Sequence, residues 1–289
     1  MKNLILFSAF LLFICSCNFS KKKPLSTNEE INRMMSFDSA TVTSHFLDEK
    51  TASSFPGTIL MVAEANGNMA VVFNSLPLTV SDFTDDYNAF QHGNVTMLEV
   101  DGQTYGIMPK HMFGKDIDLR EALRSQNFNI VKNNSDIVSI RLKKKQATLT
   151  AEPFEKLEPE KLDGAPCTVR TLNYFKGEPG IREYLIQGTL HYISPTFQKA
   201  NAVNTVNMFG KKTEGVPTDG MYVVRVPNVF FWDILGMSGG SATVTVDGKE
   251  RFLGTNNFRF TPIITGGKDT TVMVMLAIQP VLKKDLSED

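Results

Sequence analysis

Short apolar runs separated by tight-turn dipeptides dominate the chain between residues 56 and 280. In three places two such runs flank a dipeptide that favours a two-residue hairpin turn, because its residues accept positive φ: Asn66-Gly67, Asp101-Gly102 and Asp247-Gly248. The other strand-like runs cover residues 136–142, 183–193, 221–226 and 270–278. Helical periodicity is scarce. We predict short helices only over 27–35, where Thr27 and Glu30 form a capping box, and over 118–125.

Many short strands joined by tight turns predict an all-β protein with closed sheets, either barrels or a sandwich. A polar, proline-bearing stretch at residues 151–163 has no apolar period, and we interpret it as the connection between two folded units.

The first 16 residues have the pattern of an export signal. Lys2 precedes an apolar run over residues 4–14, which as a helix spans about 16 Å, well short of a bilayer core of about 30 Å. We therefore predict a signal peptide rather than a membrane-spanning helix. The following Ile14-Cys15-Ser16-Cys17 resembles a bacterial lipobox. That resemblance implies cleavage before Cys17, lipid attachment to Cys17, and a location in the bacterial cell envelope, periplasmic or surface-exposed. The alternative is a plainly secreted protein.

Composition narrows the classes of function. With 30 basic and 31 acidic side chains the net charge is −1, which argues against a general nucleic-acid binder. Residues 17–55 are polar and predict a tether, and residues 281–289 predict a polar tail. Cleavage before Cys17 leaves Cys167 as a thiol with no partner in the chain. The sequence shows no metal-ligand spacing and no nucleotide-binding glycine pattern, so we expect no metal and no cofactor.

A glycine-rich segment carries the first candidate chemistry. Gly236-Met237-Ser238-Gly239-Gly240 directly precedes a predicted strand over 242–246. Glycines beside a serine allow a sharp turn and leave two N–H groups unobstructed near the hydroxyl, as an oxyanion hole requires. An ordinary glycine-rich turn is the alternative interpretation.

A serine nucleophile needs a base, and the base needs an orienting partner. His111 follows the end of the predicted strand 103–108, where a rigid strand end could hold a base. Asp136 opens the alternating strand 136–142. Each residue alone is more often structural. The other histidines fit less well: His45 lies in the polar leader, His92 in a Gly/Asn-rich loop and His191 inside a predicted strand.

Three segments together resemble the trypsin-like (chymotrypsin-fold) serine peptidases, particularly the bacterial branch without disulfides. They are residues 106–111 ending in His111, Asp136-Ile137-Val138-Ser139-Ile140-Arg141-Leu142, and the Gly236–Gly240 segment. The resemblance covers residues 90 to 260 and extends more faintly from 56 to 280. It implies two six-stranded β-barrels, over 56–150 and 151–280, with the site in the crevice between them.

By the same resemblance, Ser238 attacks a carbonyl, His111 transfers the proton and Asp136 orients His111, while the N–H groups of Gly236 and Ser238 bind the oxyanion. Counting back six residues from Ser238 places Trp232 at the base of the specificity pocket. A shift of one residue would place Asp233 there and favour basic side chains.

Three residues depart from the family pattern. Met108 and Pro109 stand where the family usually has Thr and Ala, and Pro109 could alter how the strand presents His111. Met237 replaces the usual acid or amide before the serine, so pairing with a new N-terminal ammonium is not available.

The sequence therefore predicts a membrane-anchored serine endopeptidase whose substrate is a protein or peptide. Two alternatives remain open. One is a catalytically inactive trypsin-like fold that serves as a binding or scaffold lipoprotein. The other is an unrelated β-sandwich lipoprotein that binds glycans or peptides.

Overall fold

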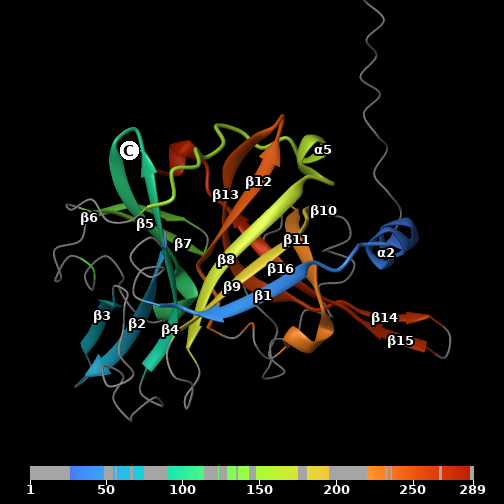
Figure 1. Ribbon diagram of the computed structural model, residues 1–289, viewed down its shortest axis with the longest axis horizontal. Helices are drawn as coiled ribbons and strands as arrows, with labels where there is room; N and C mark the ends of the chain where they lie inside the picture. Colours follow the sequence, from blue (N-terminus) through green and yellow to red (C-terminus); the bar gives the residue numbers. More distant parts are fainter. Residues whose placement is uncertain are drawn as a thin grey trace, which may run out of the picture.

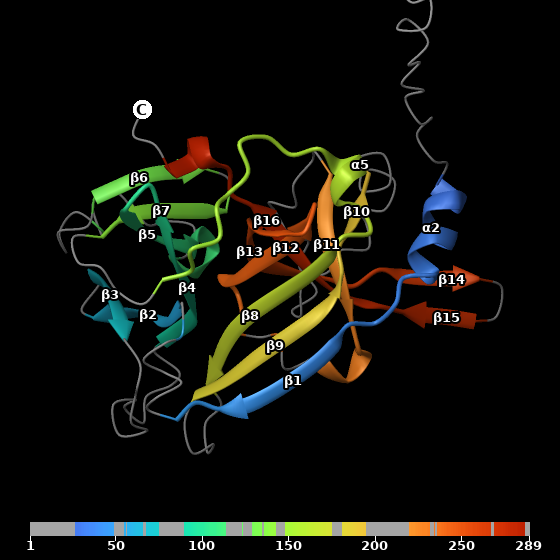
Figure 2. The ribbon, with the colours of Figure 1, turned by 45° about the horizontal axis from the view of Figure 1, so that its top comes forward.

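A computed structural model describes residues 27–48, 55, 57–65, 68–74, 90–113, 123, 129–134, 136–142, 148–174, 181–194, 220–231, 234, 236–266 and 269–286. Within these ranges the strands form a six-stranded, an eight-stranded and a two-stranded sheet, in which all ladders are antiparallel. Figures 1 and 2 show the six-stranded sheet on the left and the eight-stranded sheet beside it on the right.

The six-stranded sheet has the order β3-β2-β4-β5-β7-β6. Its strands are β2 (Gly57–Ala65), β3 (Asn68–Asn74), β4 (Phe90–Val100), β5 (Gln103–Pro109), β6 (Asn129–Asn134) and β7 (Ile137–Arg141). The β4–β5 hairpin is confirmed, because Asp101 and Gly102 both have positive φ, 51° and 75°. The turn at 66–67 lies outside the described residues, but β2 and β3 pair on either side of it as predicted.

The eight-stranded sheet has the order β1-β9-β8-β12-β13-β16-β11-β10. Its strands are β1 (Thr41–Phe46), β8 (Pro166–Tyr174), β9 (Ile181–Thr189), β10 (His191–Ile193), β11 (Met221–Val226), β12 (Gly240–Val246), β13 (Lys249–Phe260) and β16 (Val274–Pro280). The predicted β12–β13 hairpin is also confirmed, with Asp247 and Gly248 at φ 51° and 71°. The remaining ribbon, β14 (Ile263–Gly266) with β15 (Asp269–Val272), extends away from the body (Figure 2).

The second sheet differs from the expectation of six strands. Two edge strands, β1 and β10, extend it to eight. In the described part of the chain each sheet runs from one edge strand to another, and no ladder closes either into a barrel. The observed fold is therefore all-β and built on two main sheets.

Several boundaries differ from the prediction for local reasons. The expected strand 183–193 divides into β9 and β10 at Leu190, and 270–278 divides into β15 and β16 at Met273. The expected helix 118–125 lies outside the described residues apart from Leu123, which is buried. The segment 281–289 is not a plain polar tail, because Val281 and Leu286 are buried and 283–286 forms the 3-10 turn η5 (Lys283–Leu286).

A shared apolar cluster joins the two main sheets. Leu98 of β4 and Ile107 of β5 pack with Phe252 of β13 and with Val281 after β16. Leu98, Ile107 and Phe252 are fully buried. Burial of apolar area at this junction stabilises the arrangement of the sheets.

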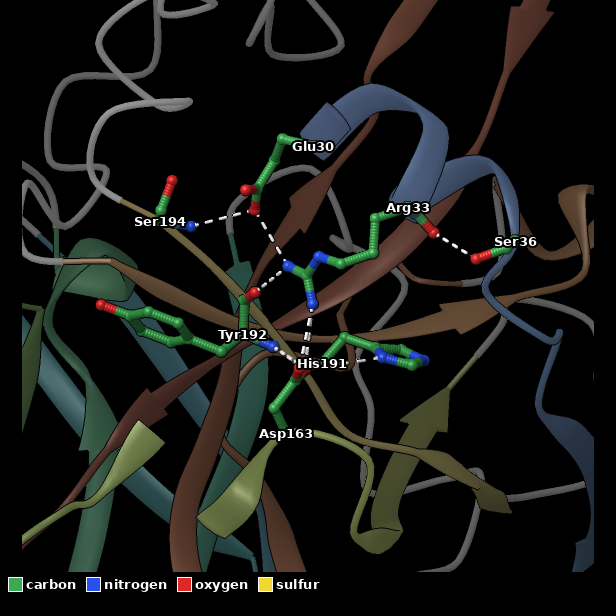
Figure 3. A network of polar contacts seen from close by, with 7 residues as sticks. All are labelled: Glu30, Arg33, Ser36, Asp163, His191, Tyr192 and Ser194. Atoms are coloured by element: carbon green, nitrogen blue, oxygen red, sulfur yellow. Dashed lines mark hydrogen bonds and ion pairs between the residues drawn. The ribbon is translucent and has the colours of Figure 1, made fainter. Parts of the chain in front are cut away.

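The described helices are α2 (Thr27–Met35) and α5 (Pro159–Leu162), and α2 confirms the helix predicted at 27–35. Figure 3 shows how α2 is fixed to the end of the eight-stranded sheet. Arg33 pairs with Glu30 at 2.9 Å and with Asp163, next to α5, at 3.0 Å. Arg33 also donates to the carbonyl of Tyr192 in β10. Residues 27–46, which we expected to be tether, therefore belong to the folded body.

No helix among the described residues is long and apolar enough to cross a membrane. The predicted signal peptide at 1–16 and the lipidation site Cys17 lie outside the described residues.

Candidate active site

His111 and Asp136 meet at one end of the six-stranded sheet. The neighbouring strands β5 and β7 pair through Pro109 and Ile137. Asp136 directly precedes β7, and His111 lies in the 3-10 turn η3 (Lys110–Phe113) that follows β5. Asp136 Oδ2 lies 2.8 Å from His111 Nδ1, and Oδ1 accepts the backbone N–H of His111 at 2.9 Å. The sequence-predicted pair is therefore brought together.

This contact defines which ring nitrogen of His111 is available. A carboxylate only accepts hydrogen bonds, so Nδ1 carries the hydrogen and, in the neutral ring, Nε2 is the bare nitrogen. The imidazole is 37% exposed and the carboxylate beneath it 12%. Pro109 ends β5 without separating His111 from Asp136.

A third residue, Asn257, holds the same carboxylate from the other sheet. The β13–β16 register shifts between Asn256 and Phe258, so Asn257 is the extra residue of a β-bulge. Bulges redirect side chains, and here the amide Nδ2 donates to Asp136 Oδ2 at 2.9 Å and to the Asp136 carbonyl at 3.1 Å. The Asp136 carboxylate thus accepts three N–H hydrogen bonds, two from His111 and one from Asn257.

Ser238 contacts the backbone of the same residue, Asn257. Its Oγ donates to the backbone carbonyl of Asn257 at 3.1 Å. Among the described residues, Ser238 Oγ makes no hydrogen bond with His111. Phe258 follows Asn257 in β13, and the centroid of its ring lies 5.6 Å from the centroid of the His111 ring. Ser238 and Asp136 therefore share Asn257 as a hydrogen-bond partner, and His111 lies between Asp136 and Phe258, but the hydroxyl and the imidazole form no hydrogen bond with each other.

We call residues 236–239, just before β12, the nucleophile loop, after the role that the sequence predicts for Ser238. Gly236 and Gly239 have φ of 84° and 90°, a conformation that residues with a Cβ rarely adopt. A Cβ at Gly239 would also overlap the backbone carbonyl of Asn94 and lie 2.8 Å from the Pro109 ring. The two glycines are therefore required by both backbone angle and space.

The carbonyl of Met237 points into the protein. It accepts hydrogen bonds from Thr171 Oγ1 at 2.9 Å and Asn256 Nδ2 at 3.1 Å, and both residues are buried. A trans peptide places C=O and the following N–H on opposite sides, so the N–H of Ser238 points away from these groups. Within the described residues this N–H has no hydrogen-bond acceptor. Such a donor beside a serine hydroxyl is what an oxyanion hole uses.

The comparisons with known proteins find only distant similarity. No protein-family model and no curated protein matches the sequence. Among solved structures, the NS6 protease from murine norovirus 1 is 9% identical, with a TM-score of 0.33 over 66% of this chain and 89% of that chain. The Vibrio cholerae VesB protease is 13% identical, with a TM-score of 0.37 over 82% of this chain and 64% of that chain. At these values the similarity does not assign the chain to a family.

The remaining histidines have other surroundings. His92 lies in β4, not in a loop as predicted, and its Nε2 is 3.1 Å from Asn173 Oδ1. Burial lowers the pKa of His92 below its ordinary value. His45 pairs with Glu183 at 2.9 Å, and His191 lies 3.7 Å from Asp163.

The candidates for the specificity pocket, Trp232 and Asp233, lie outside the described residues.

Over the part of the chain that the structure covers, no group of three or more His, Cys, Asp or Glu side chains could hold a metal ion. Cys167 is buried and free, and burial raises its pKa to about 12.

Sequence reasoning missed Asn257. Its role depends on a bulge and on contacts with residues more than 100 positions earlier, which no local pattern reveals. The one local signal was the pair Asn256-Asn257 inside a strand, because asparagine is depleted in strand interiors.

Proposed function

We propose that this protein is a serine endopeptidase of the trypsin-like type, with Ser238 as nucleophile, His111 as general acid and base, and Asp136 as the group that orients His111. Its substrate is a protein or peptide, and the N–H groups of Gly236 and Ser238 bind the oxyanion. The observation that carries the proposal is a chain of contacts: Asp136 bonds both His111 and Asn257, and the Asn257 carbonyl accepts the Ser238 hydroxyl. It links the three segments that together resemble the peptidase family.

The proposed reaction has two steps. Ser238 Oγ attacks the carbonyl carbon of a peptide bond while its proton passes to His111 Nε2. The proton then moves to the amine, the C–N bond breaks, and an ester remains on Ser238. Water attacks the ester and gives a proton to His111, which returns it to Ser238 Oγ as the acid leaves. The first step requires Ser238 Oγ to exchange its bond with the Asn257 carbonyl for one with His111 Nε2, by rotation about Cα–Cβ.

Asn257 supports this proposal in two ways. Its amide holds Asp136 in the position where the carboxylate meets His111 Nδ1. Its backbone carbonyl holds the Ser238 hydroxyl in a resting position nearby. We further propose that the two main sheets correspond to the two barrels of the chymotrypsin type, with the site at their junction.

One observation favours the alternative of an inactive binding or scaffold protein. Ser238 donates to the Asn257 carbonyl, not to His111, so the hydroxyl is not activated in this state. If that hydrogen bond persists when a peptide is bound, Ser238 does not act as a nucleophile and the peptide is not cleaved. The two functions differ in whether Ser238 reacts with an electrophile.

A fluorophosphonate probe separates these two functions. Attack by Ser238 Oγ on phosphorus expels fluoride and leaves a stable phosphonate ester, so no knowledge of the natural substrate is needed. We expect the wild-type protein to be labelled and Ser238→Ala to remain unlabelled. Ser241→Ala is the matched control, because Ser241 lies three residues further along in β12 and is buried. This control should be labelled like the wild type.

Two results would overturn the proposal. Absence of labelling in a folded wild-type protein would favour the inactive alternative. Labelling that survives in Ser238→Ala would show that another residue is the nucleophile.

We propose separately that the protein is held in the bacterial cell envelope by lipid on Cys17. The support is the apolar run at 4–14 followed by the lipobox-like Ile14-Cys15-Ser16-Cys17. Two acyl chains or more on one terminus give stable membrane binding. In a bacterial host, the wild type should partition with membranes and Cys17→Ser with the aqueous phase. Equal partition of the two would favour plain secretion.

A further inference from the structure

One face of β4 lies against the nucleophile loop. His92, Asn94 and Thr96 occupy alternate positions of this strand, and alternate residues of a strand share a face. The strand belongs to the six-stranded sheet, whereas the loop leads into β12 of the eight-stranded sheet. The contacts between them therefore cross from one sheet to the other.

Asn94 makes the densest set of these contacts. Its amide Nδ2 donates to the carbonyls of Leu172 at 3.0 Å and Gly236 at 3.2 Å. Its Oδ1 accepts the backbone N–H of Leu172 at 2.8 Å, which defines the orientation of the amide. The backbone N–H of Asn94 donates to the carbonyl of Ser238 at 2.6 Å. One buried residue of the first sheet thus holds both β8 and the loop.

Thr96 and His92 hold the two ends of the loop. Thr96 Oγ1 donates to the carbonyl of Gly239 at 2.8 Å. Asn173 Oδ1 already accepts the N–H of Tyr174 at 2.8 Å, so His92 Nε2 is the donor in its 3.1 Å contact with Asn173. The His92 ring fills the space that a Cβ on Gly236 would need.

Thr171 and Asn256 bond the carbonyl of Met237, and the contacts with β4 bond the other three carbonyls of the loop. Gly236, Ser238 and Gly239 all direct their carbonyls at β4. A loop whose carbonyls are all bonded inside the protein has one backbone conformation, and its N–H groups are held in place before any substrate arrives. Such preorganisation is the main source of oxyanion stabilisation.

We propose that His92, Asn94 and Thr96 are positioning residues: this face of β4 sets the conformation of the nucleophile loop, so the loop is ordered for reaction only when the two main sheets are docked. The catalytic part of this inference rests on the proposed peptidase function. The structural part does not, because it concerns the order of the loop itself.

Thr96→Val tests the inference with the smallest change in shape. Valine keeps the volume of threonine but leaves the Gly239 carbonyl without its donor. Thr104→Val is the matched control, since Thr104 is also buried in the six-stranded sheet but makes no hydrogen bond to residues 236–239. Thr96→Ser should restore the wild-type behaviour, because it restores the hydroxyl.

The first measurement needs no activity. In a Ser238→Ala background, amide hydrogen exchange over residues 236–241 should be about 10-fold faster with Thr96→Val, because a hydrogen bond that holds the loop is lost. The same exchange should be unchanged with Thr104→Val and restored with Thr96→Ser. If Thr96→Val leaves loop exchange at the reference rate, β4 does not order the loop and the inference is wrong.

The second measurement is the rate of fluorophosphonate labelling at Ser238. We expect Thr96→Val to lower it about 10- to 100-fold, since small displacements of reacting groups have effects of this size. An unchanged labelling rate alongside faster loop exchange would overturn the catalytic part alone. A wild-type protein that is not labelled, yet shows the predicted exchange, would contradict the peptidase function and support the positioning role.

Discussion

Asn257 Nδ2 lies 2.9 Å from Asp136 Oδ2, and this hydrogen bond joins a bulge in one sheet to the start of a strand in the other. The same residue accepts the Ser238 hydroxyl on its carbonyl. The candidate site therefore depends on how the two sheets are docked as well as on the three residues recognised from sequence.

Asn257→Ala should slow labelling of Ser238 about 10-fold, because Asp136 loses one of its three donors and orients His111 less well. The labelling rate at fixed probe concentration is the measurement. Asn228→Ala is a suitable control, since Asn228 is exposed and, within the part of the chain that the structure describes, its amide bonds only the Val272 carbonyl. Equal rates for Asn257→Ala and wild type would show that Asn257 does not help Asp136 to orient His111.

Asp136→Asn should have a much larger effect, lowering the labelling rate by about 10⁴-fold. An asparagine side chain has one accepting oxygen in place of two, and its NH2 group only donates, so His111 loses the partner that keeps hydrogen on Nδ1. Circular dichroism should show that the fold is retained. The same change in the exposed turn residue Asp101 should leave the rate unaltered, and a small effect of Asp136→Asn would mean that His111 does not depend on this carboxylate.

The burial of His92 should make the free energy of unfolding depend on pH. Burial lowers its pKa in the folded state below 6.5, so the unfolded chain takes up a proton first as the pH falls. The free energy of unfolding should therefore decrease from pH 6.5 down to the folded pKa, by up to about 1.4 kcal/mol per pH unit, and not above pH 6.5. Denaturant titrations of wild type and His92→Gln between pH 8 and pH 5 measure this, and the variant should show a shallower acid decline. Parallel curves would mean that His92 is not held neutral.

Cys167 should be chemically inert in the folded protein. Its thiol is fully buried and its pKa is raised to about 12, because burial disfavours the thiolate. Iodoacetamide at pH 8 should leave the Cys167 peptide unmodified until denaturant is added, as measured by mass spectrometry. Modification of the native protein at a rate typical of an exposed thiol would contradict the packing around β8.

The turns were accessible from sequence because each is a local pattern, and the contact between His111 and Asp136 was accessible because three segments together resemble a known family. Asp101-Gly102 and Asp247-Gly248 require positive φ, and the structure has it at both turns. Asp136 and His111 were selected at strand ends, and the pairing of Pro109 with Ile137 places those ends side by side.

Other parts were not accessible because they depend on distant partners. β1 has mostly exposed side chains and no apolar alternation, and it is a strand only because β9 offers a free edge. β8 was missed because Thr171 and Asn173 interrupt its apolar pattern, yet both are buried against the site. The second sheet has eight strands because β1 and β10 add to its edges, and no repeat in the sequence indicates these additions.

The most direct test of the account is a crystal structure of the wild-type protein after exposure to a fluorophosphonate. We predict phosphorus bonded to Ser238 Oγ, a phosphonyl oxygen accepting the N–H groups of Gly236 and Ser238, and His111 Nε2 within hydrogen-bond distance of Oγ, with the 2.8 Å contact between His111 and Asp136 retained. An unmodified Ser238 that still donates to the Asn257 carbonyl would contradict the account.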